Sequence, residues 1–190
     1  MSQYKILLAS KSPRRKELLE SLGYTFDTIS IDCDEVFPDN LETDKIAGYL
    51  SELKANAYRD LKENEILITA DTIVALNGEV LGKPVDELHA KEMLRKLSGK
   101  IHEVYTGITI RTIKTEVTQT DVAHVEFSEL TDDEIDTYVK NFRPLDKAGS
   151  YGIQEWIGMA KATTINGSYY TIMGLPTHLI YEELRKIQGA

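Results

Sequence analysis

Short apolar runs alternate with segments of helical periodicity along most of this 190-residue chain. The run Tyr4–Ala9 predicts a buried strand. The next helix is expected from Pro13 to Leu22, with Ser12 as its N-cap and Gly23 as its stop. Phe26–Ile31 then predicts a second strand. Because strands joined through a helix can pair in parallel, this alternation favours the α/β class.

Further along the chain, hairpins are mixed with helices. Paired strand-like runs predict hairpins at residues 66–76 with 79–81, 104–112 with 116–127, and 160–165 with 169–173. Helices are expected at residues 46–61, 87–97 behind an Asp86 cap, 132–141 behind a capping box at Thr131, and 176–187. We therefore expect a mixed, twisted sheet with flanking helices, in a single domain over residues 1–190.

Composition excludes several classes of protein. With 42% hydrophobic and 28% charged residues the chain is globular, and no apolar run approaches the roughly 20 residues that span a bilayer. The single cysteine, Cys33, excludes an internal disulfide framework. We therefore expect a cytoplasmic protein without a membrane partner.

Charge is distributed unevenly along the chain. The 22 basic and 31 acidic residues give a net charge of −9, which argues against nucleic acid as a partner. The first 16 residues nevertheless hold five basic residues and no acidic one, so the rest carries 17 − 31 = −14. A local basic cluster of this kind can bind a small polyanion even when the whole protein is acidic.

The segment from Ser10 to Lys16 predicts a phosphate site. Cations are unfavourable in the first turn of a helix, where backbone N–H groups already create a partial positive charge. Arg14 and Arg15 stand in that turn. Amides, hydroxyls and guanidinium groups that converge on one point suit a phosphate group. The alternative is a capped surface helix with solvated arginines.

Two acidic positions are candidates for metal or proton chemistry. Asp71 lies inside the apolar stretch 66–76, where a carboxylate is costly to bury unless it is paired, binds a metal or does chemistry. The run Asp32–Glu35 directly follows the second predicted strand and offers hard oxygen ligands for magnesium or manganese. The alternatives are a structural aspartate in a turn and a solvated acidic face.

Two loops could contact a ligand. Lys83 stands between Gly82 and Pro84 at the end of a predicted hairpin, although the spacing excludes a P-loop and an ordinary exposed lysine fits equally well. The loop 145–154 ends in Gln154, whose amide can read the edge of a base. A structural turn with a surface ion pair is the alternative for this loop. The scattered histidines predict no zinc site.

Several motifs together resemble the Maf (septum-formation) family of nucleoside triphosphate pyrophosphatases. The resemblance runs from Leu7 to about Glu182 and rests on the segments Ser10–Arg15, Ala70–Val74, Gly82–Pro84, Leu97–Gly99 and Asp146–Gly149. It implies a mixed α/β fold like that of inosine triphosphate pyrophosphatases, with two lobes around a cleft, commonly as a homodimer. It also implies hydrolysis of a nucleoside triphosphate to the monophosphate and pyrophosphate with a divalent cation (magnesium, manganese or cobalt).

The resemblance also implies roles for individual residues. Asp71 resembles the catalytic acid that accepts the proton of water and, with Glu35, a metal ligand. The residues similar to substrate contacts are Ser10, Arg14, Arg15, Lys54, Thr72, Lys83 and Gln154. Lys147 and the segment Tyr151–Gln154 are similar to the dTTP and UTP branch of the family.

Three positions depart from the family pattern. Glycine is expected where Thr69 and Glu155 stand, and threonine where Ile101 stands. Two further functions remain open at the level of sequence. One is a non-catalytic nucleotide- or DNA-binding regulator of septum formation. The other is a phosphatase that releases single orthophosphate groups.

Overall fold

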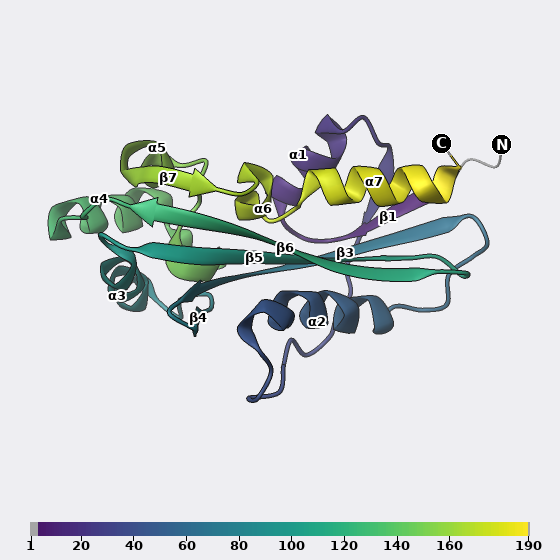
Figure 1. Ribbon diagram of the computed structural model, residues 1–190, viewed down its shortest axis with the longest axis horizontal. Helices are drawn as coiled ribbons and strands as arrows, with labels where there is room; N and C mark the ends of the chain where they lie inside the picture. Colours follow the sequence, from purple (N-terminus) through teal and green to yellow (C-terminus); the bar gives the residue numbers. More distant parts are fainter. Residues whose placement is uncertain (1–3, 190) are drawn as a thin grey trace. The chain divides into compact units, whose positions relative to one another are not determined.

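Seven strands form one mixed sheet in residues 4–189, the part of the chain that the computed structural model describes (Figure 1). They are β1 (Lys5–Ala9), β2 (Phe26–Ile29), β3 (Glu65–Leu76), β4 (Glu79–Leu81), β5 (Ile101–Arg111), β6 (Glu116–Phe127) and β7 (Ala162–Asn166). Their order across the sheet is β2-β1-β3-β5-β6-β7, with β4 paired to β3. The predicted mixed α/β class is therefore confirmed.

Helices flank the strands. They are α1 (Pro13–Ser21), α2 (Thr43–Asn56), α3 (Glu87–Leu97), α4 (Asp132–Phe142), α5 (Trp156–Lys161), α6 (Tyr169–Met173) and α7 (Thr177–Gln188). Among the described residues, none of these helices is long and apolar enough to cross a membrane.

The chain divides into two compact units. The first comprises the described residues of Met1–Asp71, Thr106–Asp121 and Gly174–Ala190, and the second comprises Thr72–Tyr105 and Val122–Met173. Strands β3, β5 and β6 contribute residues to both units.

In the first unit, parallel strands bring two candidate segments to the same end of the sheet. β1 pairs in parallel with β2 and with β3, and in the second pairing Ala9 lies opposite Thr69. The loop that begins at Ser10 directly follows Ala9, and Asp71 lies two residues after Thr69 on β3. The two segments therefore start from the same pair of neighbouring residues. Figure 1 shows α2 on one face of this part of the sheet and α1 and α7 on the other.

Helix α2 lies unusually close to strand β5. A Cβ atom built on Gly107 would lie 2.3 Å from the carbonyl carbon and oxygen of Ala47 and from the backbone nitrogen of Gly48. A Cβ atom on Gly48 would lie 2.7 Å from Oγ1 of Thr120. At position 107 only glycine allows this approach to the α2 backbone, and at position 48 a larger residue would require Thr120 to move.

We expect Gly107→Ala to destabilise the protein by at least about 2 kcal/mol, because the added methyl group overlaps backbone atoms that cannot rotate away. Chemical denaturation monitored by circular dichroism measures this loss. The matched control is Gly82→Ala, since nothing lies within 4 Å of a Cβ atom there. Equal stability of the two variants would show that α2 moves freely away from β5.

A chain of buried hydroxyl groups also holds α2 against the sheet. Thr69 of β3 donates to the carbonyl oxygen of Ser51 in α2 at 2.7 Å, and Ser51 Oγ donates to Thr109 Oγ1 of β5 at 3.0 Å. Ser51, Thr69 and Thr109 are fully buried. Threonine at position 69, which departs from the expected glycine, thus has a structural explanation in this protein.

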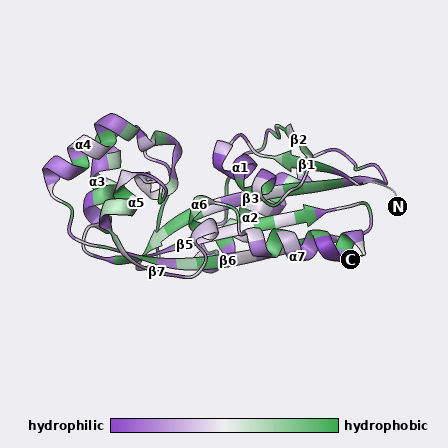
Figure 2. Cartoon of the chain, turned by 90° about the horizontal axis from the view of Figure 1, so that it is seen from above, coloured by the Kyte–Doolittle hydropathy of each residue, from purple (hydrophilic) through white to green (hydrophobic). Residues whose placement is uncertain are grey.

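In the second unit, helices α3 and α4 pack against a core that includes Leu94, Val125, Phe127 and Ile135. Figure 2 shows both helices banded in polar and apolar residues, as amphipathic helices are. Both predicted N-terminal caps of these helices are confirmed. Asp86 accepts from the His89 N–H at 2.8 Å, and Thr131 and Glu134 form the reciprocal capping box.

Two predicted boundaries were wrong in the first unit. Helix α2 ends at Asn56 rather than at Leu61. Arg111 donates to the carbonyl oxygen of Ala55 in the last turn at 2.7 Å and to that of Arg59 beyond the helix at 3.0 Å, so it satisfies carbonyl groups that a continued helix would have bonded. Leu61 is apolar because it packs on the core from an irregular segment. The second strand ends at Ile29 rather than Ile31, and Ile31 packs on the same core.

The hairpin predicted at residues 160–173 is also wrong. Residues 160 and 161 belong to α5, β7 pairs in antiparallel fashion with β6, and Tyr169–Met173 forms the helix α6. Gly167 lies between β7 and α6 with a φ of 122°, and a Cβ atom there would lie 2.8 Å from Cα of Ala123. The chain turns away from the sheet at this glycine, so no second strand follows.

Candidate active site

The loop after β1 and the start of α1 have the form expected of an anion site. Oγ of Ser10 accepts a hydrogen bond from the N–H of Ser12 at 3.1 Å, which folds the loop toward the helix. Ser12 is the N-cap as predicted, but its side chain makes no capping hydrogen bond. Pro13 begins the helix, and the first turn contains no acidic residue. The partial positive charge of this helix end is therefore not offset by an acidic side chain of its first turn.

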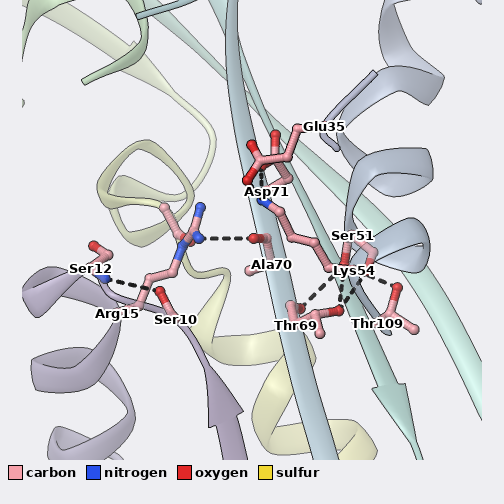
Figure 3. Close-up of polar contacts among 11 residues, drawn as sticks. Ser10, Ser12, Arg15, Glu35, Ser51, Lys54, Thr69, Ala70, Asp71 and Thr109 are labelled. Carbon is pink, nitrogen blue, oxygen red and sulfur yellow. Dashed lines mark hydrogen bonds and ion pairs between the residues drawn. The ribbon is translucent and has the colours of Figure 1, made fainter. Parts of the chain in front are cut away.

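Arg15 ties α1 to the rest of the first unit. Its Nε donates to the carbonyl oxygen of Gly174 at 2.8 Å, and its Nη1 donates to the carbonyl oxygen of Ala70 at 2.8 Å (Figure 3). Burial lowers the pKa of the Arg15 guanidinium, although such a group remains charged in proteins. This residue therefore holds α1 beside the strand residue that precedes Asp71. Its predicted contact with phosphate stays a prediction.

The centre of the site is an ammonium group shared by two carboxylates. Nζ of Lys54, one turn after Ser51 in α2, donates to Oδ1 of Asp71 and lies 3.1 Å from Oε1 of Glu35 (Figure 3). The Asp71 residue is only 8% exposed, whereas the Glu35 side chain is 47% exposed. Three residues that were predicted separately are thus brought together in the first unit.

The acidic run contributes less than its sequence suggested. Within Asp32–Glu35, Glu35 makes the ion pair described above, and Cys33 is a half-buried thiol whose pKa is raised by burial. Among residues 4–189, no group of three or more histidine, cysteine, aspartate or glutamate side chains is gathered around a possible metal position. The predicted metal ligands Asp71 and Glu35 stay a prediction.

The remaining candidate substrate contacts lie outside the ion-pair cluster of Lys54, Asp71 and Glu35. Arg14 is half-buried in the first turn of α1, next to Arg15. Thr72 follows Asp71 on β3 but belongs to the second unit, as do Lys83 and Gln154. Lys83 lines a cavity of about 200 Å³ in that unit, together with residues of β4 and α3.

The loop that contains Gln154 is held by a buried polar cluster. Nζ of Lys147 lies 2.8 Å from Oδ1 of Asp146 and 3.2 Å from Oε1 of Glu155, and the hydroxyl of Tyr138 donates to Oε2 of Glu155. Oε1 of Gln154 is buried and has no hydrogen-bond partner among the described residues. An unpaired buried acceptor costs roughly 1–3 kcal/mol, so a ligand that donates to it would gain affinity.

Sequence reasoning did not identify Tyr138 as part of this cluster. Tyr138 lies on α4, far along the chain from the loop, and reads there as an ordinary core residue of an amphipathic helix. Glu155 departs from an expected glycine, and the sequence does not indicate its contacts with Tyr138 and Lys147. An acidic residue beside a predicted ligand loop was the one available signal, and it did not indicate a partner.

Taken together, the described residues form a mixed α/β protein in which Lys54, Asp71 and Glu35 meet in the first unit. Residues 5–187 match the model of the family described as Maf-like protein. The chain belongs to the Maf family, as its motifs indicated.

Curated relatives cover almost the whole chain. The dTTP/UTP pyrophosphatases of Phocaeicola vulgatus and Bacteroides thetaiotaomicron are each 48% identical over 189 residues, with 98% of this chain and 98% of the relative covered. That of Porphyromonas gingivalis strain W83 is 46% identical, with 97% and 95% covered. A solved structure of a HAM1 protein from Coxiella burnetii has a TM-score of 0.41 and 17% identity, and covers 66% of this chain and 73% of that chain.

Proposed function

We propose that this protein hydrolyses nucleoside triphosphates, with dTTP and UTP as its preferred substrates, to the nucleoside monophosphate and pyrophosphate. The observation that carries the proposal is the Lys54 ammonium shared between Glu35 and Asp71, which lies in the middle of β3. The names of relatives at 46–48% identity over nearly the whole chain support the same activity.

The substrate's phosphates would be bound by groups that carry positive charge or donate hydrogen bonds. Ser10, Arg14 and the first-turn amides of α1 form one such set, with Arg15 beside them. Lys54 supplies a further ammonium group in the first unit, and Lys83 in the second unit stays a predicted phosphate contact. Such donors stabilise the charge that develops on the phosphoryl oxygens and on the departing pyrophosphate.

A divalent cation fits the first unit on chemical grounds. Asp71 and Glu35 are hard oxygen ligands that already share one cation, the Lys54 ammonium, so they can share another. Magnesium is commonly held by one or two carboxylates together with water and substrate phosphates, which matches this pair. When bound, magnesium, manganese or cobalt would polarise the phosphoryl oxygens and lower the pKa of a bound water.

Asp71 is the proposed proton acceptor in the chemical step. A water oxygen forms a bond to the α-phosphorus while the bond from that phosphorus to the bridging oxygen of the β-phosphate breaks. The proton of the water passes to the Asp71 carboxylate, and the bridging oxygen leaves with the pyrophosphate. Before metal and substrate bind, Lys54 holds one oxygen of this carboxylate, which keeps the group oriented toward the site.

The base would be read in the second unit. The Gln154 amide offers an acceptor that is unpaired in the free protein, and a uracil or thymine presents a ring N–H between two carbonyl groups. Thr72 and Arg14 are the other residues that we propose for base selection. A homodimeric assembly and a cytoplasmic location stay predictions.

The products of UTP hydrolysis test the proposal directly. Incubation with magnesium, manganese or cobalt is expected to give UMP and pyrophosphate in equal amounts, resolved by ion-exchange chromatography. UDP and orthophosphate would indicate a phosphatase instead. If no canonical or modified triphosphate is hydrolysed with any of the three metals, the non-catalytic nucleotide- or DNA-binding regulator becomes the better hypothesis.

A further inference from the structure

The carboxylate of Glu155 joins three parts of the second unit. Its Oε1 lies 3.2 Å from Nζ of Lys147, and its Oε2 accepts from the hydroxyl of Tyr138 on α4. The side chains of Glu155 and Lys147 are only 17% and 9% exposed. Loss of this ion pair is costly, because Lys147 then keeps only its exposed partner Asp146.

The same cluster fixes the backbone of the loop. The hydroxyl of Tyr138 accepts a hydrogen bond from the backbone N–H of Gly152 at 3.1 Å while it donates to Glu155. Burial raises the pKa of this hydroxyl, so it keeps its proton and can serve both partners. Lys147, Glu155, Tyr138 and Gly152 therefore form one connected chain of contacts around residues 147–155.

Gln154 is packed into this arrangement. A Cβ atom on Gly152 would lie 2.8 Å from Cδ of Glu155 and 3.0 Å from Nε2 of Gln154, so both side chains fold back over the glycine. Oε1 of Gln154 is buried and has no partner among the described residues, although the charged groups of the neighbouring cluster are paired. The loop thus keeps one strong acceptor unsatisfied while it satisfies its charges.

We propose that Glu155 is a specificity-determining positioning residue, which holds Lys147 and Tyr138 so that Gln154 offers its unpaired oxygen to the ring N–H of a uracil or thymine. The inference rests on the proposed function, because it assigns a base to the same loop. Glu155 itself does not touch the base. Cytosine has an unprotonated ring nitrogen at the corresponding position, which repels an acceptor, so UTP should be favoured over CTP.

Two substitutions at Glu155 test this role. In Glu155→Ala both contacts are lost, and we expect the ratio of kcat/KM for UTP to that for CTP to fall at least tenfold, through loss of UTP turnover alone. Glu155→Gln can still accept from Tyr138 but carries no charge for Lys147, so an intermediate ratio is expected. Asp136→Asn is the matched control, since it removes an exposed ion pair with Lys91 in the same unit and should leave the ratio unchanged.

Binding of UMP and CMP, measured by calorimetry on the same variants, separates this inference from the proposed function. The wild-type protein should prefer UMP, and Glu155→Ala should lose that preference. If the wild-type protein hydrolyses no triphosphate but still prefers UMP, the proposed function fails and the role of Glu155 stands. Equal binding of UMP and CMP by the wild-type protein overturns the inference, as does an unchanged preference in a cooperatively folded Glu155→Ala. Should that variant fail to fold, an unchanged preference in Glu155→Gln overturns it.

Discussion

Replacement of Asp71 by asparagine is expected to lower kcat about 100- to 10,000-fold, the range that a positioned general base contributes. The amide cannot accept the proton of the attacking water. It also presents one neutral oxygen where the carboxylate presented a charge to Lys54. Steady-state kinetics with UTP and manganese measures kcat, and calorimetry with UMP measures whether nucleotide binding survives.

We expect nucleotide affinity to change less than tenfold in Asp71→Asn, because the proposed phosphate contacts and Gln154 are intact. Asp27→Asn is the matched control, since Asp27 forms an exposed ion pair with Lys5 in the same unit. Both variants should melt cooperatively. Turnover at the wild-type rate in a folded Asp71→Asn would remove Asp71 from the chemical step and leave it as the structural partner of Lys54.

Local sequence signals predicted most of the fold. The N-terminal strand and helix, the Asp86 cap and the capping box at Thr131 depend on neighbours within a few residues, so the sequence alone contains the relevant interactions. The predictions are wrong where contacts between residues far apart in the sequence determine where an element ends. The end of α2 depends on Arg111, which lies on β5 and has no local signature of a cap.

The candidate site was predictable to a different degree at each residue. Asp71 could be recognised from the sequence, because a carboxylate inside an apolar strand is costly to bury unless it is paired or has a function. Lys54 is not, since a lysine on an amphipathic helix usually points to solvent, and only the family resemblance singled it out. The structure brings the two together through the docking of α2 on the sheet, which depends on Gly107, Gly48 and the buried hydroxyls.

The Glu155 cluster was beyond sequence reasoning for a similar cause. Its members lie at positions 138, 147 and 155, and only the packing of α4 beside the loop places them in contact. Charge pairs along the chain suggested a partner for Lys147 in Asp146, which is correct but exposed. The buried partner, Glu155, is eight residues away, and its identity follows from the fold alone.

Replacement of Lys54 by methionine is expected to tighten the binding of Mn²⁺ to the nucleotide-free protein at least tenfold, or about 1.4 kcal/mol. The ammonium lies between the two carboxylates that a divalent cation would use, so the two cations compete for Asp71 and Glu35. Methionine has a similar length without the charge. Electron paramagnetic resonance of free Mn²⁺ measures the affinity without any need for turnover.

The sign of this change identifies the metal ligands, whereas a loss of activity in Lys54→Met would not. Without metal the variant leaves Asp71 and Glu35 close to each other with no shared cation, so it should melt at a lower temperature in EDTA and recover when Mn²⁺ is added. Lys5→Met removes an exposed lysine of the same unit and should change neither property.

Weaker or unchanged Mn²⁺ binding in Lys54→Met would mean that the cation does not bind at these carboxylates. Tighter binding would mean that Lys54 neutralises the site until metal and triphosphate arrive, and that its ammonium is then available to the phosphates.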